Sequence, residues 1–65
     1  MRVGAVFASP EGRMYKVLGP SKGKNRVRLQ ALWGFGTKEE TMAVRELEKW
    51  TLTKTGDGAE IPVSP

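Results

Sequence analysis

Residues 26–31 read Arg-Val-Arg-Leu-Gln-Ala, and this alternation decides how the chain folds. Successive side chains of a β-strand point to opposite faces, so the three apolar residues share one face and the polar residues share the other. Such a strand is half-buried, with one face on a core and one in solvent, which is typical of an antiparallel sheet.

The segments before this strand follow the same pattern of short strands and turns. Residues 13–18 alternate basic and apolar side chains, which predicts a second strand with Lys16 on its outer face. Residues 3–8 are rich in strand formers. Turns are predicted at Ser-Pro-Glu-Gly, residues 9–12, and at the glycine-bearing polar segment 19–25.

The second half of the chain carries weaker signals. Residues 37–40 predict an exposed loop, and residues 41–44 a short fourth strand. Residues 45–49 form a helix-like window of about one turn, and residues 50–53 favour a fifth strand. In an alternative interpretation, residues 38–50 form one amphipathic helix with its apolar residues inward.

Together these elements predict an all-β fold, a small five-stranded antiparallel barrel with a one-turn helix before the last strand. The barrel is expected over residues 1–54. Glycine, aspartate and proline dominate residues 55–65, so this segment is predicted to be a disordered tail.

The order of strands, turns and helical window resembles the SH3-like small β-barrels, including Tudor-like and KOW-type domains, of the kind that phages and mobile elements encode. The segments that carry this resemblance are residues 4–7, 15–18, 26–29 and 44–50. The resemblance implies a barrel that binds nucleic acid or an extended peptide.

A narrower resemblance involves three segments, residues 17–19, 23–29 and 42–46. They are similar to part of the carbon-storage-regulator family of small RNA-binding dimers. An arginine after the fourth strand contacts RNA in that family, and Arg45 is the matching position here. Residues 33–38 form a loop where the family is tight.

Composition excludes most catalytic and metal chemistry. The 65 residues include no cysteine and no histidine, so disulfides, thiolate metal sites and the commonest general base are absent. The seven acidic residues show no calcium-loop spacing. We therefore expect a protein that is not an enzyme and has no metal or cofactor. No apolar run approaches the ~20 residues of a membrane span, and we expect a cytoplasmic protein without a membrane partner.

Charge is sorted along the sequence. The chain has a net charge of +4 and a pI near 9.9. Seven basic residues and no acidic one lie between residues 12 and 38. A basic face of this kind attracts polyanions. The predicted nucleic-acid-binding residues are Arg13, Lys16, Lys22, Lys24, Arg26, Arg28, Trp33, Phe35 and Lys38.

The two aromatic residues in this set have two interpretations. Trp33 and Phe35 flank a glycine directly after the basic strand, where an exposed ring could stack on a base. Alternatively, a large side chain at this point closes the end of a small core. We expect one of the two to belong to the core.

The leading hypothesis is a nucleic-acid-binding module for RNA or DNA. The alternative is a protein-interaction module that binds an acidic protein or an extended peptide. A third hypothesis is a homo-oligomer whose assembly completes the site.

Overall fold

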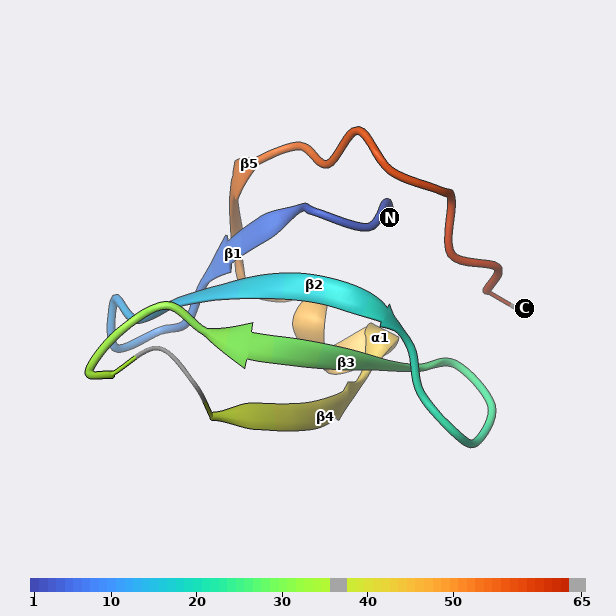
Figure 1. Cartoon of the computed structure of the whole chain (residues 1–65), viewed down its shortest axis with the longest axis horizontal. Helices are drawn as coiled ribbons and strands as arrows, with labels where there is room; N and C mark the ends of the chain where they lie inside the picture. The colour runs from blue at the N-terminus through green and yellow to red at the C-terminus, as the bar shows by residue number, and fades with distance from the viewer. Residues whose placement is uncertain (36–37, 64–65) are drawn as a thin grey trace.

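The computed structural model describes residues 1–35 and 38–63. These residues form one five-stranded antiparallel sheet in the order β4-β3-β2-β1-β5, with a short helix before the last strand (Figure 1). The prediction of an all-β fold with this helix is confirmed. The elements are β1 (Val6–Ala8), β2 (Met14–Pro20), β3 (Arg26–Ala31), β4 (Glu39–Ala43), α1 (Val44–Leu47) and β5 (Thr51–Lys54).

Strands β2 and β3 form the central hairpin of the sheet. Tyr15 pairs with Ala31 and Val17 with Leu29, so the apolar residues of both strands share one face. This face is buried, and we call it the inner face; the opposite, solvent-exposed face is the outer face. Beyond Val17 the register shifts, so that Gly19 pairs with Arg28.

The fourth strand is longer than its sequence predicts. Glu39 and Glu40, expected in a loop, begin β4 and pair with Gln30 and Leu29 of β3. The alternative helix over residues 38–50 is wrong, since helical structure is confined to Val44–Leu47. Pairing with β3 hydrogen-bonds the backbone of this charged segment, and this tertiary effect overrides the weak local preference.

The core lies between the inner face of the sheet and α1. Val44 and Leu47 of α1 are fully buried beside Val17, Val27 and Leu29. The Val44 backbone N–H donates to the carbonyl oxygen of Asn25 at 2.8 Å, which ties the start of α1 to the β2–β3 turn. Within the described residues no helix is long and apolar enough to cross a membrane.

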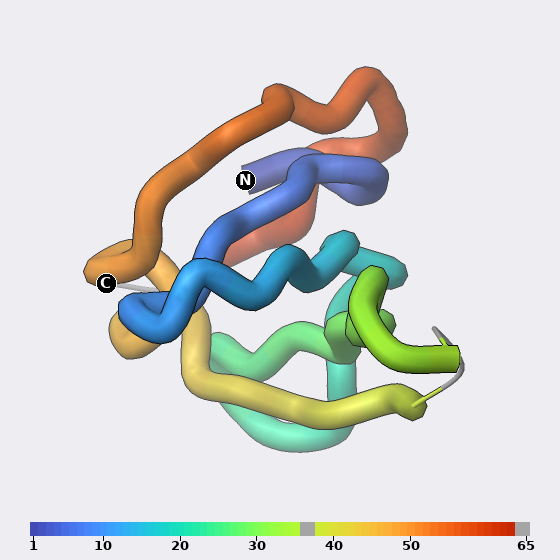
Figure 2. Tube along the Cα trace, turned by 90° about the vertical axis from the view of Figure 1, so that its left-hand side faces the viewer, coloured from blue at the N-terminus to red at the C-terminus, as the bar shows by residue number. Residues whose placement is uncertain are grey.

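The segment after β5 is packed, where the sequence predicts disorder. It runs beside the first residues of the chain in both views (Figures 1 and 2). The Val3 N–H donates to Ala59, and the Gly58 N–H donates to Val3, both at 3.0 Å. Ile61 is only 4% exposed. Residues 64–65 of the predicted tail lie outside the described residues.

Glycine explains why this segment can pack so closely. A Cβ atom at Gly56 would collide with the carbonyl oxygen of Val3 and the backbone nitrogen of Ala5. The absence of a side chain therefore allows backbone to lie against backbone. A glycine-rich composition, which in the sequence indicates flexibility, here permits a close contact.

Ion pairs join the two terminal segments. The Glu60 carboxylate lies 3.0 Å from the Met1 amino group and 3.3 Å from Nε of Arg2. The hydrogen bond and charge of the Met1 amino group, and then the charge of Arg2, lower the pKa of Glu60 from its ordinary value of 4.5.

Replacing Gly56 with alanine tests the close packing of this segment. The added methyl group must displace backbone atoms, so we expect Gly56→Ala to lower the free energy of unfolding by about 1–3 kcal/mol. Asp57→Ala, which truncates an exposed neighbouring side chain, is the control and is expected to change it little. Urea denaturation measures both. A Gly56→Ala protein as stable as the wild type would contradict the packing.

The lowered pKa of Glu60 makes its contribution to stability depend on pH. The contribution is complete above the ordinary pKa of 4.5 and is lost as the pH falls through the lower pKa of the folded state. Glu60→Gln removes the ionisable group, so the stabilities of wild type and variant should converge on acidification. Urea midpoints between about pH 6 and pH 3 would show this. A difference between the urea midpoints of the two proteins that stays constant with pH would refute this prediction.

Candidate nucleic-acid interface

The outer face of the central hairpin carries three of the predicted basic residues. Lys16 of β2 and Arg26 and Arg28 of β3 are exposed. The two arginines are two residues apart on one strand, which places them about 7 Å from each other. Lys16 pairs with Gln30, so it lies on the strand next to β3 and diagonal to Arg28. The three cations therefore form one group on adjacent central strands.

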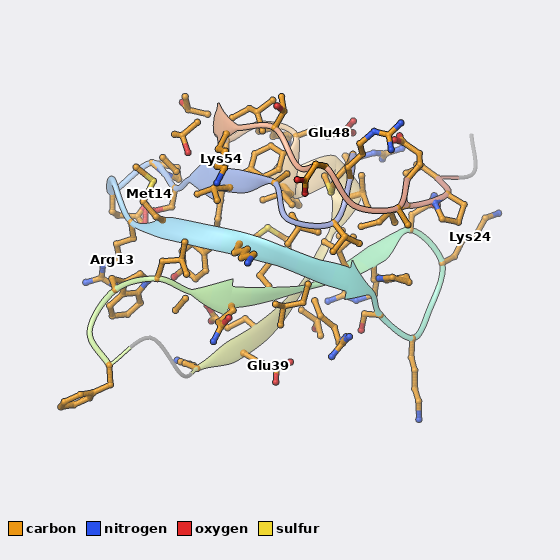
Figure 3. All side chains as sticks on the ribbon, turned by 45° about the horizontal axis from the view of Figure 1, so that its top comes forward. Arg13, Met14, Lys24, Glu39, Glu48 and Lys54 are labelled. Atoms are coloured by element: carbon orange, nitrogen blue, oxygen red, sulfur yellow. The ribbon has the colours of Figure 1, made fainter. Side chains whose placement is uncertain are left out.

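Two more predicted residues lie in the turn that joins these strands. Lys22 and Lys24 are exposed there, at the end of the hairpin where Figure 3 labels Lys24. Gly23 and Asn25 adopt positive φ angles of 95° and 56°, the conformation that such a tight turn requires. We call the set Lys16, Lys22, Lys24, Arg26 and Arg28 the basic strip.

Strand β4 limits the basic strip on one side. Glu39 Oε1 lies 3.5 Å from Nη1 of Arg28, and both side chains are about half exposed. Nη2 of Arg26 donates a hydrogen bond to Thr41 Oγ1 at 3.2 Å. The ion pair of Glu39 was not predicted, because residues 37–40 were expected to form a loop. An exposed pair of this kind contributes about 0–1 kcal/mol, so it orients Arg28 without withdrawing it from solvent.

Arg13 and Trp33 meet at the opposite end of the hairpin. The Arg13 guanidinium carbon lies 4.2 Å from the centroid of the Trp33 ring. Trp33 also packs edge-to-face on Tyr15, with ring centroids 6.3 Å apart, and contacts the core. Its Nε1 atom is buried and has no hydrogen-bond partner among the described residues. Trp33 therefore belongs to the end of the core, and Arg13 covers one face of its ring.

Phe35 differs sharply from Trp33. Its side chain is 99% exposed, whereas Trp33 is only partly exposed. Gly34, between them, has a φ of 64°, which turns the chain away from the core. Lys38 is exposed and is followed by β4. Trp33 is thus in contact with the core, in line with the expectation that one of the two aromatic residues belongs to it, and Phe35 is in solvent.

Two apolar residues that sequence analysis did not select lie at the same end. Met14 and Leu32 are 39% and 46% exposed, and the Leu32 N–H donates to the Met14 carbonyl oxygen at 2.9 Å. Both follow the alternation of the outer face, Met14 with Lys16 and Leu32 with Gln30. That alternation could have identified them. We call Met14, Leu32 and Phe35 the apolar end.

The hairpin therefore has two unlike ends. In Figure 3, Arg13 and Met14 lie at one end of the hairpin and Lys24 at the other. The predicted residues do not form one compact patch, because the length of β3, about 20 Å, separates the lysine turn from the aromatic loop. The arrangement suits an elongated polyanion that also offers an apolar or aromatic group.

The acidic residues are candidates for metal-ligand groups and for ion pairs with neighbouring cations. Within residues 1–35 and 38–63 no group of three potential ligands could hold a metal ion. Glu46 pairs with Lys49 at 3.6 Å across one turn, as its spacing predicts.

Removing the Arg13 guanidinium tests its contact with Trp33. Arg13→Ala should uncover the indole and lower stability by about 0.5–1 kcal/mol, the usual worth of an exposed cation–π contact. In a Trp50→Phe background Trp33 is the single tryptophan, so acrylamide quenching of its fluorescence should increase. Equal quenching with and without Arg13 would show that the contact does not form in solution.

Comparison with known proteins assigns no function to this geometry. No protein-family model, no curated protein and no solved structure matches the chain.

Proposed function

We propose that this chain is a non-enzymatic nucleic-acid-binding module that holds a polynucleotide backbone on the outer face of β2 and β3. The observation that carries the proposal is the basic strip, which groups five exposed cations on one hairpin. Among the described residues, Glu39 is the one acidic group within ion-pair distance of the strip.

Electrostatics supplies the binding energy in this proposal. Each phosphate that a lysine or arginine neutralises releases condensed counterions, which favours association at low salt. Arg26 and Arg28 add planar guanidinium groups that can hold two phosphate oxygens at once. Exposed cations that repeat along a strand match the repeating charges of a polynucleotide.

The position of the strip argues against a purely protective role. Charged side chains protect a sheet from aggregation at its edge strands, where backbone groups are unpaired. Strands β2 and β3 are internal, because each pairs with neighbours on both sides. Their backbone needs no such protection, so the density of positive charge there requires another explanation.

The second candidate function is binding of an extended peptide. It is favoured by a groove of about 200 Å³ on the inner side of the hairpin. Tyr15 and Trp50, with ring centroids 5.3 Å apart, line it together with Glu11 and Glu40. Its acidic residues suit a basic peptide better than the acidic partner that the sequence suggested.

Salt dependence distinguishes a phosphate contact from general attraction. Arg28→Ala should weaken binding to oligonucleotides and flatten the slope of log K against log salt by about 0.7–0.9. Arg26→Ala combined with Arg28→Ala should change the slope by roughly twice as much. Fluorescence anisotropy titrations at several salt concentrations would measure both.

Lys49→Ala is the matched control. Lys49 also forms one exposed ion pair, at 3.6 Å compared with 3.5 Å for Arg28, and its removal changes the net charge equally. It lies after α1 and outside the β2–β3 hairpin that carries the strip. If Lys49→Ala and Arg28→Ala reduced binding equally, the protein would attract nucleic acid only through its net charge, and the proposed site would be refuted.

A further inference from the structure

We infer that the polynucleotide bound by the basic strip is single-stranded and that the apolar end holds one of its unpaired bases. The inference rests on the proposed function, because it concerns the ligand of the same hairpin. Three observations carry it. The apolar end is exposed, the Trp33 ring is already covered by other side chains, and the basic strip is narrow in the direction across the strands.

The apolar end exposes its three side chains to solvent, although the Met14 sulfur also accepts a hydrogen bond from Thr53 Oγ1 at 3.9 Å. Phe35 is 99% exposed, and Met14 and Leu32 retain 39% and 46% of their surface in solvent. Aromatic and apolar side chains at the end of a basic surface bind the flat faces of bases. In a duplex those faces are stacked on each other, so such a surface gains contact only from an unpaired base.

Phe35 is the ring available for stacking. Arg13 already covers Trp33 at 4.2 Å, and Tyr15 contacts it at an angle of 79°. Stacking a base on Trp33 would require displacement of Arg13, whereas a base can reach Phe35 without rearrangement of the described residues.

The residues that are paired side by side across the strands with Lys16 form a row, and this row shows how narrow the basic strip is. In this row Lys16 is followed by Gln30 on β3 and Glu39 on β4. Two strand spacings separate Lys16 from Glu39, about 10 Å, which is close to the ~12 Å width of a DNA major groove. A duplex whose near phosphates lie on Lys16 would thus bring its second strand towards a carboxylate.

On the β1 side of Lys16, the same row offers a duplex few additional cations. Val6 of β1 lies next to Lys16, and Lys54 of β5 lies beyond Val6. In Figure 3 Lys54 and Glu39 lie on opposite sides of β2. Lys54 is the one basic residue of β5, whose other members are Thr51, Leu52 and Thr53. A single line of phosphates along β3 meets more cations than a second line on either side.

The length of the hairpin sets the size of the ligand. From Arg26 to Leu32 the strand direction covers about 20 Å. A single strand that runs from the lysine turn to Phe35 fits a site of about four nucleotides, at the lower limit for small single-strand-binding barrels.

The test compares single strands with duplexes of the same sequence. Labelled DNA and RNA oligonucleotides of about eight nucleotides, long enough to cover the site, are titrated with the wild type and with Phe35→Ala. Because Phe35 is fully exposed, its removal should leave the thermal unfolding midpoint unchanged. Leu32→Ala and Leu52→Ala form a matched pair, since the two side chains are 46% and 48% exposed and only Leu32 belongs to the apolar end.

We expect the wild type to bind the single strand more tightly than the duplex. Phe35→Ala should weaken single-strand binding by about five- to hundredfold, the range that stacking on one aromatic ring provides, with duplex binding unchanged. Leu32→Ala should weaken it to a smaller extent, and Leu52→Ala should have no effect.

Two results would overturn the inference and leave the proposed function intact. One is equal affinity for duplex and single strand. The other is unchanged single-strand affinity in Phe35→Ala while Arg26→Ala with Arg28→Ala still loses binding. Absence of binding to every oligonucleotide at low salt would overturn the proposed function together with the inference.

Discussion

The register between β2 and β3 is the constraint on which the rest of the structure depends. It places Val17 against Leu29 on the inner face and Lys16 against Gln30 on the outer face. A slip of one residue would exchange the two faces and bury charged side chains without partners, at a large cost in free energy. The same pairing that forms the core therefore also collects the cations on one surface.

The bulge in this hairpin links the register to the basic strip. After Val17 the pairing shifts, and Arg28 lies opposite Gly19. A Cβ atom at Gly19 would stand 3.7 Å from Nη2 of Arg28, so the guanidinium lies next to the backbone of β2. Because bulges increase the local twist of a hairpin, this position also helps to curve the sheet around its small core.

Local alternation was sufficient to predict the hairpin, and contacts between distant segments were not predictable from it. Residues 26–31 show their two faces directly, and the same rule extends to Met14 and Leu32. Glu39, in contrast, is eleven residues from Arg28 in the sequence, and the two side chains meet only because β4 pairs with β3.

The packing of the terminal segment was not predictable either. Ile61 packs near Met1 because Gly56 and Gly58 permit close approach of the backbone. Composition cannot distinguish glycine that permits a contact from glycine that loosens a chain.

Fold and surface charge are carried by opposite faces of the same two strands, so most of their residues can vary independently. Substitutions of Lys16 or Arg26 change the outer face without entering the core, whereas Val27 and Leu29 are held by packing. Trp33 is the exception, since its ring closes one end of the core and also contacts the guanidinium of Arg13. At this end the contact that stabilises the fold also positions a cation, and Phe35 extends beyond it into solvent. A base bound there would meet a ring two residues after Trp33, which packs against the core. This attachment restricts the loop and so reduces the entropy lost on stacking.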